Sequence, residues 1–179
     1  MKRCSWCNTN NPIYVKYHDE EWGKLRTDNT YLFEMLILES FQAGLSWQCV
    51  LNKREAFRKA YNDFNLEKVI LYDNKKIDEL LRNKGIIRNQ LKIRASIQNA
   101  KIFKNIILEY GSFYHYLCTF SNGAILYELH KTTNALSDVI SKDLKSRGMK
   151  FVGSTTIYSY LQAIGIIYSH EQDCWLHHK

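Results

Sequence analysis

Two cysteines and two histidines lie at opposite ends of the 179-residue chain. Cys4 and His18 are close to the N-terminus, and His170 and Cys174 are close to the C-terminus. The second pair has i, i+4 spacing, which predicts that both side chains share one helical face. Two thiolates and two neutral imidazoles form a closed tetrahedral zinc site, which would hold the two ends together. The alternative is a set of unrelated buried cysteines and surface histidines.

A further N-terminal cysteine offers a competing interpretation, because Cys4 and Cys7 form a CxxC motif. A thioredoxin-like redox site would require a surrounding βαβ pattern, which the sequence lacks. The chain has five cysteines and shows no signal peptide. This combination favours reduced thiols or a metal site over a disulfide framework.

A glutamate ends an apolar run and is followed closely by an aromatic residue. Glu39 follows residues 35–38, and Trp47 lies after the next turn. A half-buried carboxylate beside aromatic rings could hold a cationic heteroaromatic ligand by stacking, cation–π attraction and hydrogen bonding. The alternative is a glutamate at a helix end that points to water, since glutamate is rarely buried.

Residues 83–92 combine a tight turn with basic side chains between two apolar helical stripes. Gly85 permits the turn, and the following helix begins with free backbone N–H groups. Together with Arg88 and Lys92, these groups would form a phosphate cradle. This is the arrangement of a helix-hairpin-helix element, which grips the DNA backbone without reading bases. The alternative is an ordinary turn between helices with solvated charges.

The composition bounds the class of protein. The net charge of +7 suits a polyanionic partner, with nucleic acid as the first candidate. The hydrophobic fraction of 45% excludes intrinsic disorder, and one proline with eight glycines disfavours an all-β sandwich. The length predicts one domain, or two small lobes that share a core. No apolar run approaches membrane-spanning length, and with no signal peptide we expect a cytoplasmic protein.

Helical periodicity predicts an all-α fold. One helix begins after Asp28 and another after Ser46, and Gly111 ends the longest one. Residues 1–27 are predicted to form an irregular, aromatic-rich arm, and residues 121–134 show no clear pattern. The remaining predicted helices cover residues 66–71, 77–81, 89–110, 112–120, 135–147 and 155–167.

Taken together, the sequence resembles the 3-methyladenine DNA glycosylase I family. The resemblance covers essentially the whole chain. Its most specific parts are Tyr-His-Asp at 17–19 and Gln-Ala-Gly-Leu-Ser-Trp at 42–47. Gly-Ile-Ile-Arg at 85–88 and Lys-Phe-Val-Gly at 150–153 extend it. The resemblance implies one domain over residues 1–179, with a helix-hairpin-helix glycosylase fold and the hairpin near residues 82–92.

The resemblance also implies an activity and its residues. The protein would hydrolyse the N-glycosidic bond of 3-methyladenine in alkylated double-stranded DNA, releasing the free base and leaving an abasic site. We expect a monomer with one structural zinc per chain, held by Cys4, His18, His170 and Cys174. The catalytic residues would be Glu39 and Tyr17. The expected substrate-binding residues are Tyr17, Glu39, Trp47, Trp6, Tyr14 and Trp22, and the expected DNA-binding residues are Gly85, Ile86, Arg88, Lys92, Gly44 and Leu45.

One feature of the chain bears on the mechanism. Most glycosylases of this superfamily carry an aspartate about twenty residues beyond the hairpin, but no aspartate lies between Asp78 and Asp138. Weak acid–base assistance suits a base that is already cationic. We also expect no lysine in the pocket, and hence no lyase activity. The alternatives are a non-catalytic helix-hairpin-helix DNA-binding module and a zinc-stapled helical interaction protein.

Overall fold

A single helix, α2 (Asn29–Gln42), lies at the centre of the computed structural model, which describes residues 1–177. The last two residues of the predicted domain lie outside the described residues. Asp28 caps the helix by accepting a hydrogen bond from the Tyr31 N–H. Every residue from 32 to 41 is buried. A helix that is buried on all sides forms the centre of a fold rather than one of its faces.

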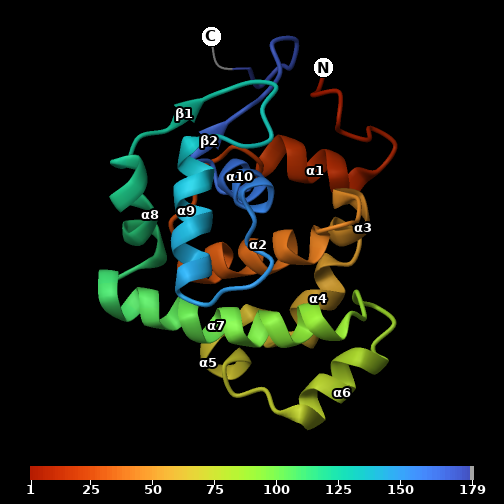
Figure 1. Ribbon diagram of the computed structural model, residues 1–179. Helices are drawn as coiled ribbons and strands as arrows, with labels where there is room; N and C mark the ends of the chain where they lie inside the picture. The colour runs from red at the N-terminus through yellow and green to blue at the C-terminus, as the bar shows by residue number, and fades with distance from the viewer. Residues whose placement is uncertain (178–179) are drawn as a thin grey trace.

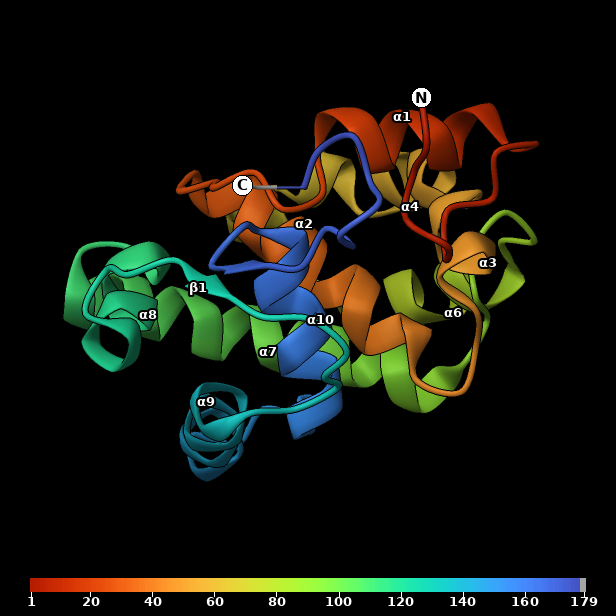
Figure 2. The same ribbon diagram turned by 90° about the horizontal axis from the view of Figure 1, so that it is seen from above.

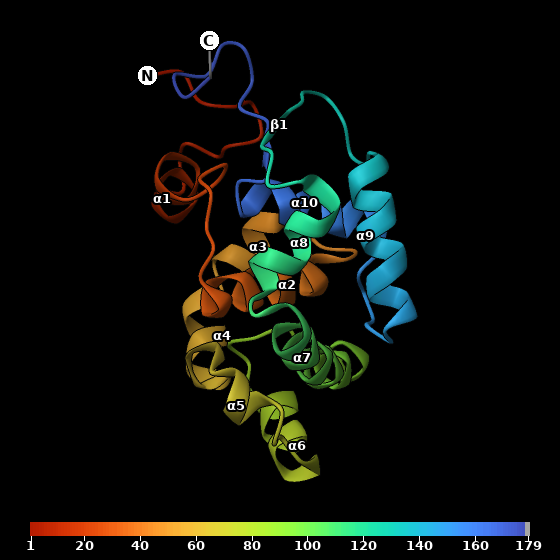
Figure 3. The ribbon, with the colours of Figure 1, turned by 90° about the vertical axis from the view of Figure 1, so that its left-hand side faces the viewer.

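Other helices surround α2. It contacts α3 (Trp47–Leu51), α7 (Gln90–Tyr110), α8 (Phe113–Ser121) and α10 (Ser154–Ala163), and α9 (Ala135–Ser146) packs on α10. Figures 1 and 3 show the N-terminal segment and the segment after α10 at one end of the molecule, with α5 and α6 at the other. Between α3 and α7 the chain forms α4 (Arg54–Ala60), η1 (Asn62–Phe64), α5 (Leu66–Val69) and α6 (Asn74–Arg82).

The fold is mostly helical, as predicted, and the 89–110 and 135–147 helices are confirmed within one residue. The helix predicted over 155–167 is too long, because α10 ends at Ala163. Gly165 then adopts a φ of 80°, and a Cβ there would lie 2.3 Å from the Leu25 backbone nitrogen. Only glycine permits this close approach. The chain continues into β2 (Ile167–Tyr168), which pairs in parallel with β1 (Leu126–Tyr127) from the unassigned segment.

The prediction that residues 1–27 are irregular is wrong over one stretch, because α1 covers Pro12–Glu20. Asn11 caps this helix and Pro12 occupies its first turn, which is a common helix start. Tyr14, Tyr17 and His18 form its buried face. That face has helical spacing, but it consists of residues with polar groups, so the apolar periodicity is weak. Figure 2, the view from above, shows α1 beside the N-terminal segment.

None of the helices within residues 1–177 is long and apolar enough to cross a membrane.

Candidate functional site

A cavity of about 340 Å³ lies where α1, α2, α3 and α10 approach one another. All six residues predicted to bind the substrate line it, which brings together side chains from four separate segments. They are Trp6, Tyr14, Tyr17, Trp22, Glu39 and Trp47. The volume falls in the range of small-molecule sites.

Glu39 is the buried carboxylate of this cavity. It sits within α2, is only 4% exposed, and its Oε2 has no hydrogen-bond partner among the described residues. Burial raises the pKa of Glu39 to about 8. The alternative interpretation, a helix-end glutamate in water, is therefore wrong, because α2 continues to Gln42 through the centre of the protein.

Glu34, the other buried glutamate of α2, is paired with cationic side chains, as buried carboxylates usually are. The Oε1 of Glu34 accepts hydrogen bonds from the Nε of Arg54 at 2.7 Å and the Nε of Arg58 at 2.8 Å. Both glutamates are buried, but only Glu34 has cationic partners. An unpaired buried carboxylate is costly. Glu39 is therefore the one of the two that is suited to a ligand.

Aromatic rings form the walls of the cavity. The rings of Tyr17 and Trp47 are tilted, with centroids 5.4 Å apart. Trp6 lies edge-on to Trp22 at 4.7 Å and to Tyr14 at 5.6 Å. The indole Nε1 of Trp47 is buried and, among the described residues, unpaired. The cavity thus presents apolar ring faces together with three buried polar atoms that lack a partner among the described residues: Trp47 Nε1, Glu39 Oε2 and Ser169 Oγ.

Some lining residues were not predicted. Ser159 and Gln162 come from α10, and Ser169 follows β2. The expectation that the pocket contains no lysine is wrong, because Lys131 lines its rim together with His130. Lys131 forms an ion pair with Glu128, with its Nζ 2.9 Å from Oε1.

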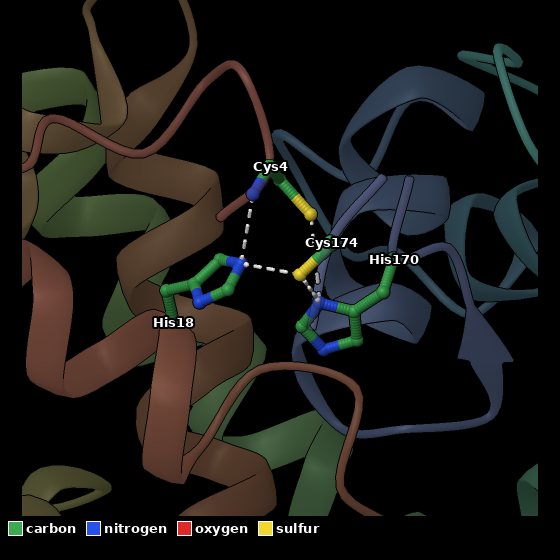
Figure 4. A group of neighbouring side chains, drawn as sticks. All are labelled: Cys4, His18, His170 and Cys174. Carbon is green, nitrogen blue, oxygen red and sulfur yellow. Dashed lines mark hydrogen bonds between the residues drawn. The ribbon is translucent and has the colours of Figure 1, made fainter. Parts of the chain in front are cut away.

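The four predicted metal ligands converge on one another, two from the N-terminal part of the chain and two from the segment after β2 (Figure 4). All are buried, and their ligand atoms lie within 4.8 Å of one another. The Sγ of Cys174 lies 3.5 Å from His18 Nε2 and 3.6 Å from His170 Nδ1, and the Cys4 Sγ lies 3.5 Å from the latter. Tetrahedral zinc, with Zn–S near 2.3 Å and Zn–N near 2.0 Å, requires S–N separations of about 3.5 Å. The donor set fits zinc.

The surroundings of these side chains also suit a cation. Asp19 Oδ1 lies 2.7 Å from His18 Nδ1, and Arg3 holds the same carboxylate at 2.7 Å through Nη2. Such a carboxylate–histidine pair orients a ligand and raises its basicity. Burial raises the pKa of Cys4 to about 12 and lowers that of His170 to about 4. The imidazole is therefore neutral, and the thiol needs a nearby positive charge to ionise.

Two expectations about the cluster are corrected. The i, i+4 pair His170 and Cys174 does not lie on a helix, because the chain forms a turn there, closed by the Cys174 N–H donating to Glu171 O. The pairing of Cys4 with Cys7 as ligands is not found. Cys7 lies outside the four-residue cluster, and its Sγ contacts the carbonyl of Tyr14.

The predicted hairpin joins α6 to α7. The N–H groups of Gly85 and Ile86 donate to the side chain and backbone carbonyl oxygens of Asn83, and Ile86 is buried. These two residues therefore shape the turn and do not themselves offer donors to a phosphate. Arg88 is exposed. The first turn of α7 leaves further N–H groups without helical partners.

The prediction that Lys92 contacts DNA is contradicted. Lys92 is only 7% exposed, and its ammonium donates to the carbonyl oxygens of Phe41 at 2.7 Å and Ala43 at 2.5 Å. Its position in the first turn of α7 places it on the inward face, so the charge is turned into the protein rather than toward solvent.

The predicted 43–45 turn projects at the C-terminus of α2. Gly44 has a φ of 81°, and a Cβ there would meet nothing within 4 Å. Leu45 is 42% exposed, although it is apolar. Ser46 then caps α3 by accepting from the Cys49 N–H. The turn therefore presents an apolar side chain to solvent close to the helix that carries Trp47.

Comparisons with known proteins agree with this geometry. The sequence model of the methyladenine glycosylase family matches residues 6–178. DNA-3-methyladenine glycosylase 1 of Escherichia coli strain K12 is 40% identical over 97% of this chain and 96% of its own length. A crystal structure of 3-methyladenine DNA glycosylase I has 38% identity and a TM-score of 0.94, covering 99% of this chain and 100% of that one. A variant of such an enzyme in complex with 3-methyladenine has 34% identity and a TM-score of 0.94, covering 100% of this chain and 99% of that one. The chain belongs to the methyladenine glycosylase family.

Proposed function

We propose that this protein is a monofunctional DNA glycosylase of base excision repair, which removes 3-methyladenine from alkylated double-stranded DNA. The observation that carries the proposal is the pair of unpaired, buried polar atoms, Glu39 Oε2 and Trp47 Nε1, in a cavity walled by aromatic rings. Such a cavity is incomplete without a flat, polar, electron-poor ligand. Family membership and the ligand of the similar structure both support this reading.

The residues divide the recognition of the base between them. Trp47 stacks on the extruded base, and Glu39 accepts hydrogen bonds from its edge. Tyr17, whose ring adjoins that of Trp47, closes the pocket. The other predicted wall residues, Trp6, Tyr14 and Trp22, exclude water from it. Glu39 favours a cationic methylated base over neutral adenine, because a positive charge offsets the cost of burying its carboxylate.

Cleavage of the glycosidic bond of 3-methyladenine needs little acid–base assistance from the protein. Methylation at N3 places a positive charge on adenine, so the bond between C1′ and N9 can break with its electron pair passing to the base. Water supplies hydroxide to C1′ and releases its second proton to solvent. Only two carboxylates line the cavity within the described residues, and Glu171 is occupied by the N–H and hydroxyl of Ser5. The enzyme therefore contributes mainly selection and extrusion.

DNA binding falls to the α6–α7 hairpin, which we interpret as a helix-hairpin-helix element. Gly85 and Ile86 shape the turn, and Arg88 with the first turn of α7 contacts phosphates. Leu45 of the 43–45 turn enters the stack in place of the extruded base, with Gly44 giving the backbone its shape. The net charge of +7 supports a duplex partner.

Zinc has a structural role in this proposal. Four protein ligands leave no open position for water, and the cluster joins the N-terminal segment to the segment after β2. The residues that would hold the ion are Cys4, His18, His170 and Cys174. Nothing in the proposed reaction requires a second subunit, so we expect the monomer to be active.

The test is incubation with alkylated duplex DNA, followed by chromatographic identification of the released bases. We expect free 3-methyladenine and an intact strand that contains abasic sites. DNA binding without base release would instead favour the non-catalytic module.

Strand cleavage with a covalent adduct trapped by borohydride would indicate a lyase. Lys131→Met is the matched variant for that outcome, because Lys131 is the lysine that lines the cavity within the described residues. Release of 3-methyladenine by Lys131→Met at the parental rate is the expected result.

A further inference from the structure

Lys92 occupies an unusual position for a lysine. It is 7% exposed, and its ammonium donates to two backbone carbonyls, those of Phe41 and Ala43, with the ring of Phe151 5.8 Å away. No carboxylate is paired with it among the ion pairs of the described residues. Burying an ammonium in this way is costly, and an apolar side chain of similar length would fill the same space at lower cost.

The two carbonyls belong to the C-terminal end of α2. The last carbonyls of a helix lack helical partners and carry the negative end of the helix dipole. The last turn of α2 contains no basic residue of its own. Lys92, which lies in the first turn of α7, therefore supplies from another helix the cation that the end of α2 lacks.

The surrounding contacts hold the ammonium in place. Asn99 of α7 is fully buried and forms two hydrogen bonds of 2.9 Å with the backbone of Lys150, one to its carbonyl and one from its N–H. This pair fixes the chain immediately before Phe151. The ring of Phe151 then covers the ammonium. The contact from α7 to the end of α2 is thus built on a rigid support.

This contact joins the two segments proposed to touch DNA. Lys92 lies four residues after Arg88 of the hairpin, and its acceptor Ala43 directly precedes Gly44 and Leu45. We propose that Lys92 is a positioning residue that fixes the 43–45 turn relative to the α6–α7 hairpin, so that gripping the backbone places Leu45 at the base to be extruded. The inference rests on the proposed function, and it assigns to Lys92 no contact with DNA or with the base.

The consequence is a separation of effects. If Lys92 fixes the position of the 43–45 turn, replacing Lys92 impairs extrusion of the base but leaves the base pocket and the hairpin intact. We therefore expect Lys92→Met to bind undamaged duplex DNA and free 3-methyladenine within about twofold of the parent. Because two charge-assisted hydrogen bonds are lost, its single-turnover rate on methylated duplex DNA should fall at least about tenfold.

Insertion of Leu45 into the stack is measured with a duplex that holds a tetrahydrofuran abasic analogue opposite 2-aminopurine. Insertion of Leu45 unstacks the fluorescent base in the parent protein, and the fluorescence rises. We expect Lys92→Met to bind this duplex with most of that rise lost. Lys101→Met is the matched control, because Lys101 is an exposed lysine nine residues along α7, on the opposite face. It should behave as the parent does in every assay.

A double-mutant cycle with Leu45→Ala tests the coupling. If Lys92 acts through the turn, Lys92→Met adds less than about twofold to the rate loss of Leu45→Ala. Additive losses would overturn the inference, as would a parental rate and fluorescence rise in Lys92→Met. A loss of free-base affinity that matches the loss of rate would also overturn it, by showing a role in the pocket instead. If Lys92→Met does not fold, Lys92→Arg enters the same cycle, with a smaller loss of the same pattern expected.

The activity of the parent protein distinguishes failure of this inference from failure of the proposed function. If the parent releases no 3-methyladenine, the proposed function fails whatever Lys92 does. If the parent releases the base and Lys92→Met is indistinguishable from it, the positioning role alone fails.

Discussion

Glu39 and Trp47 line the same cavity, and each has a buried polar atom that lacks a hydrogen-bond partner among the described residues. The Oε2 of Glu39 and the Nε1 of Trp47 are both buried, and neither has a hydrogen-bond partner within residues 1–177. Buried polar groups in proteins are almost always paired. An acceptor and a donor left open together in an aromatic pocket are therefore best explained by a ligand that completes both, as a purine with polar groups along its edge can.

Removal of the acceptor is expected to weaken base binding. Glu39→Gln should bind free 3-methyladenine about ten- to a hundredfold more weakly, because a hydrogen bond to a charged group contributes roughly 1.5–3 kcal/mol. Calorimetric titration measures this, with circular dichroism as the check on folding. Glu20→Gln, which alters an exposed glutamate of α1, is the control. Parental affinity in Glu39→Gln would refute the pocket assignment.

Removal of the Trp47 ring should also weaken binding of the free base, because stacking is lost rather than a hydrogen bond. Trp47→Ala is expected to lose about tenfold or more in affinity for 3-methyladenine, because stacking of a base on an aromatic ring contributes roughly 1–3 kcal/mol. Trp47→Phe, which keeps a ring, should lose less. Titration of both variants with the free base is the measurement. Equal losses in the two would show that stacking is not the role of this ring.

Glu39 also predicts a pH dependence of stability. Burial raises its pKa to about 8, above the unfolded value near 4.5, so the folded protein holds the proton more tightly. Between pH 4.5 and pH 8 the unfolded carboxyl ionises first, and stability falls as the pH rises. Each unit of pKa difference corresponds to about 1.4 kcal/mol, which gives a few kcal/mol in total. We expect Glu39→Gln to be increasingly more stable than the parent from pH 5.5 to pH 8.

Thermal denaturation of both proteins at each pH is the measurement. Comparison at the same pH cancels the titration of the metal ligands, which both proteins share. A difference in melting temperature that does not change with pH would mean that Glu39 already titrates normally in the folded protein.

Zinc removal should act on folding. We expect about one zinc per chain by elemental analysis, and Cys174→Ser should lower the melting temperature by about 10 °C or more, because the free energy of metal binding stabilises the fold. Cys118→Ser, at a half-buried cysteine outside the cluster, should have a small effect. Full stability of Cys174→Ser together with lost base release would indicate a catalytic metal.

The hairpin should bind DNA without reading its sequence. Arg88→Ala is expected to weaken duplex binding about equally for all sequences, and to reduce the slope of log K against log salt by about 1. Fluorescence anisotropy over a range of salt concentrations measures both. Lys142→Ala, which removes an exposed charge from α9, should leave the slope unchanged. Affinity that does not depend on salt in the parent would exclude the electrostatic interface.

The sequence by itself determined most of the helices, because capping residues and apolar periodicity are local signals. Asp28, Ser46 and Asn89 cap the helices that follow them. The burial of α2 on all sides, which places Glu34 and Glu39 inside the protein, was not predicted from the sequence. The sequence missed α1, because its buried face consists of Tyr14, Tyr17 and His18 rather than purely apolar residues.

The tertiary structure decided which charges are satisfied and which are left open. Nothing in the local sequence distinguishes Glu34 from Glu39, since the partners of Glu34 come from α4 and lie at least 20 residues away in the chain. Likewise, Lys92 follows a DNA-binding pattern in sequence, but the end of α2 lies beside the first turn of α7 and accepts its ammonium. Ion pairing and burial depend on contacts between distant segments, and the packing of helices around α2 creates those contacts.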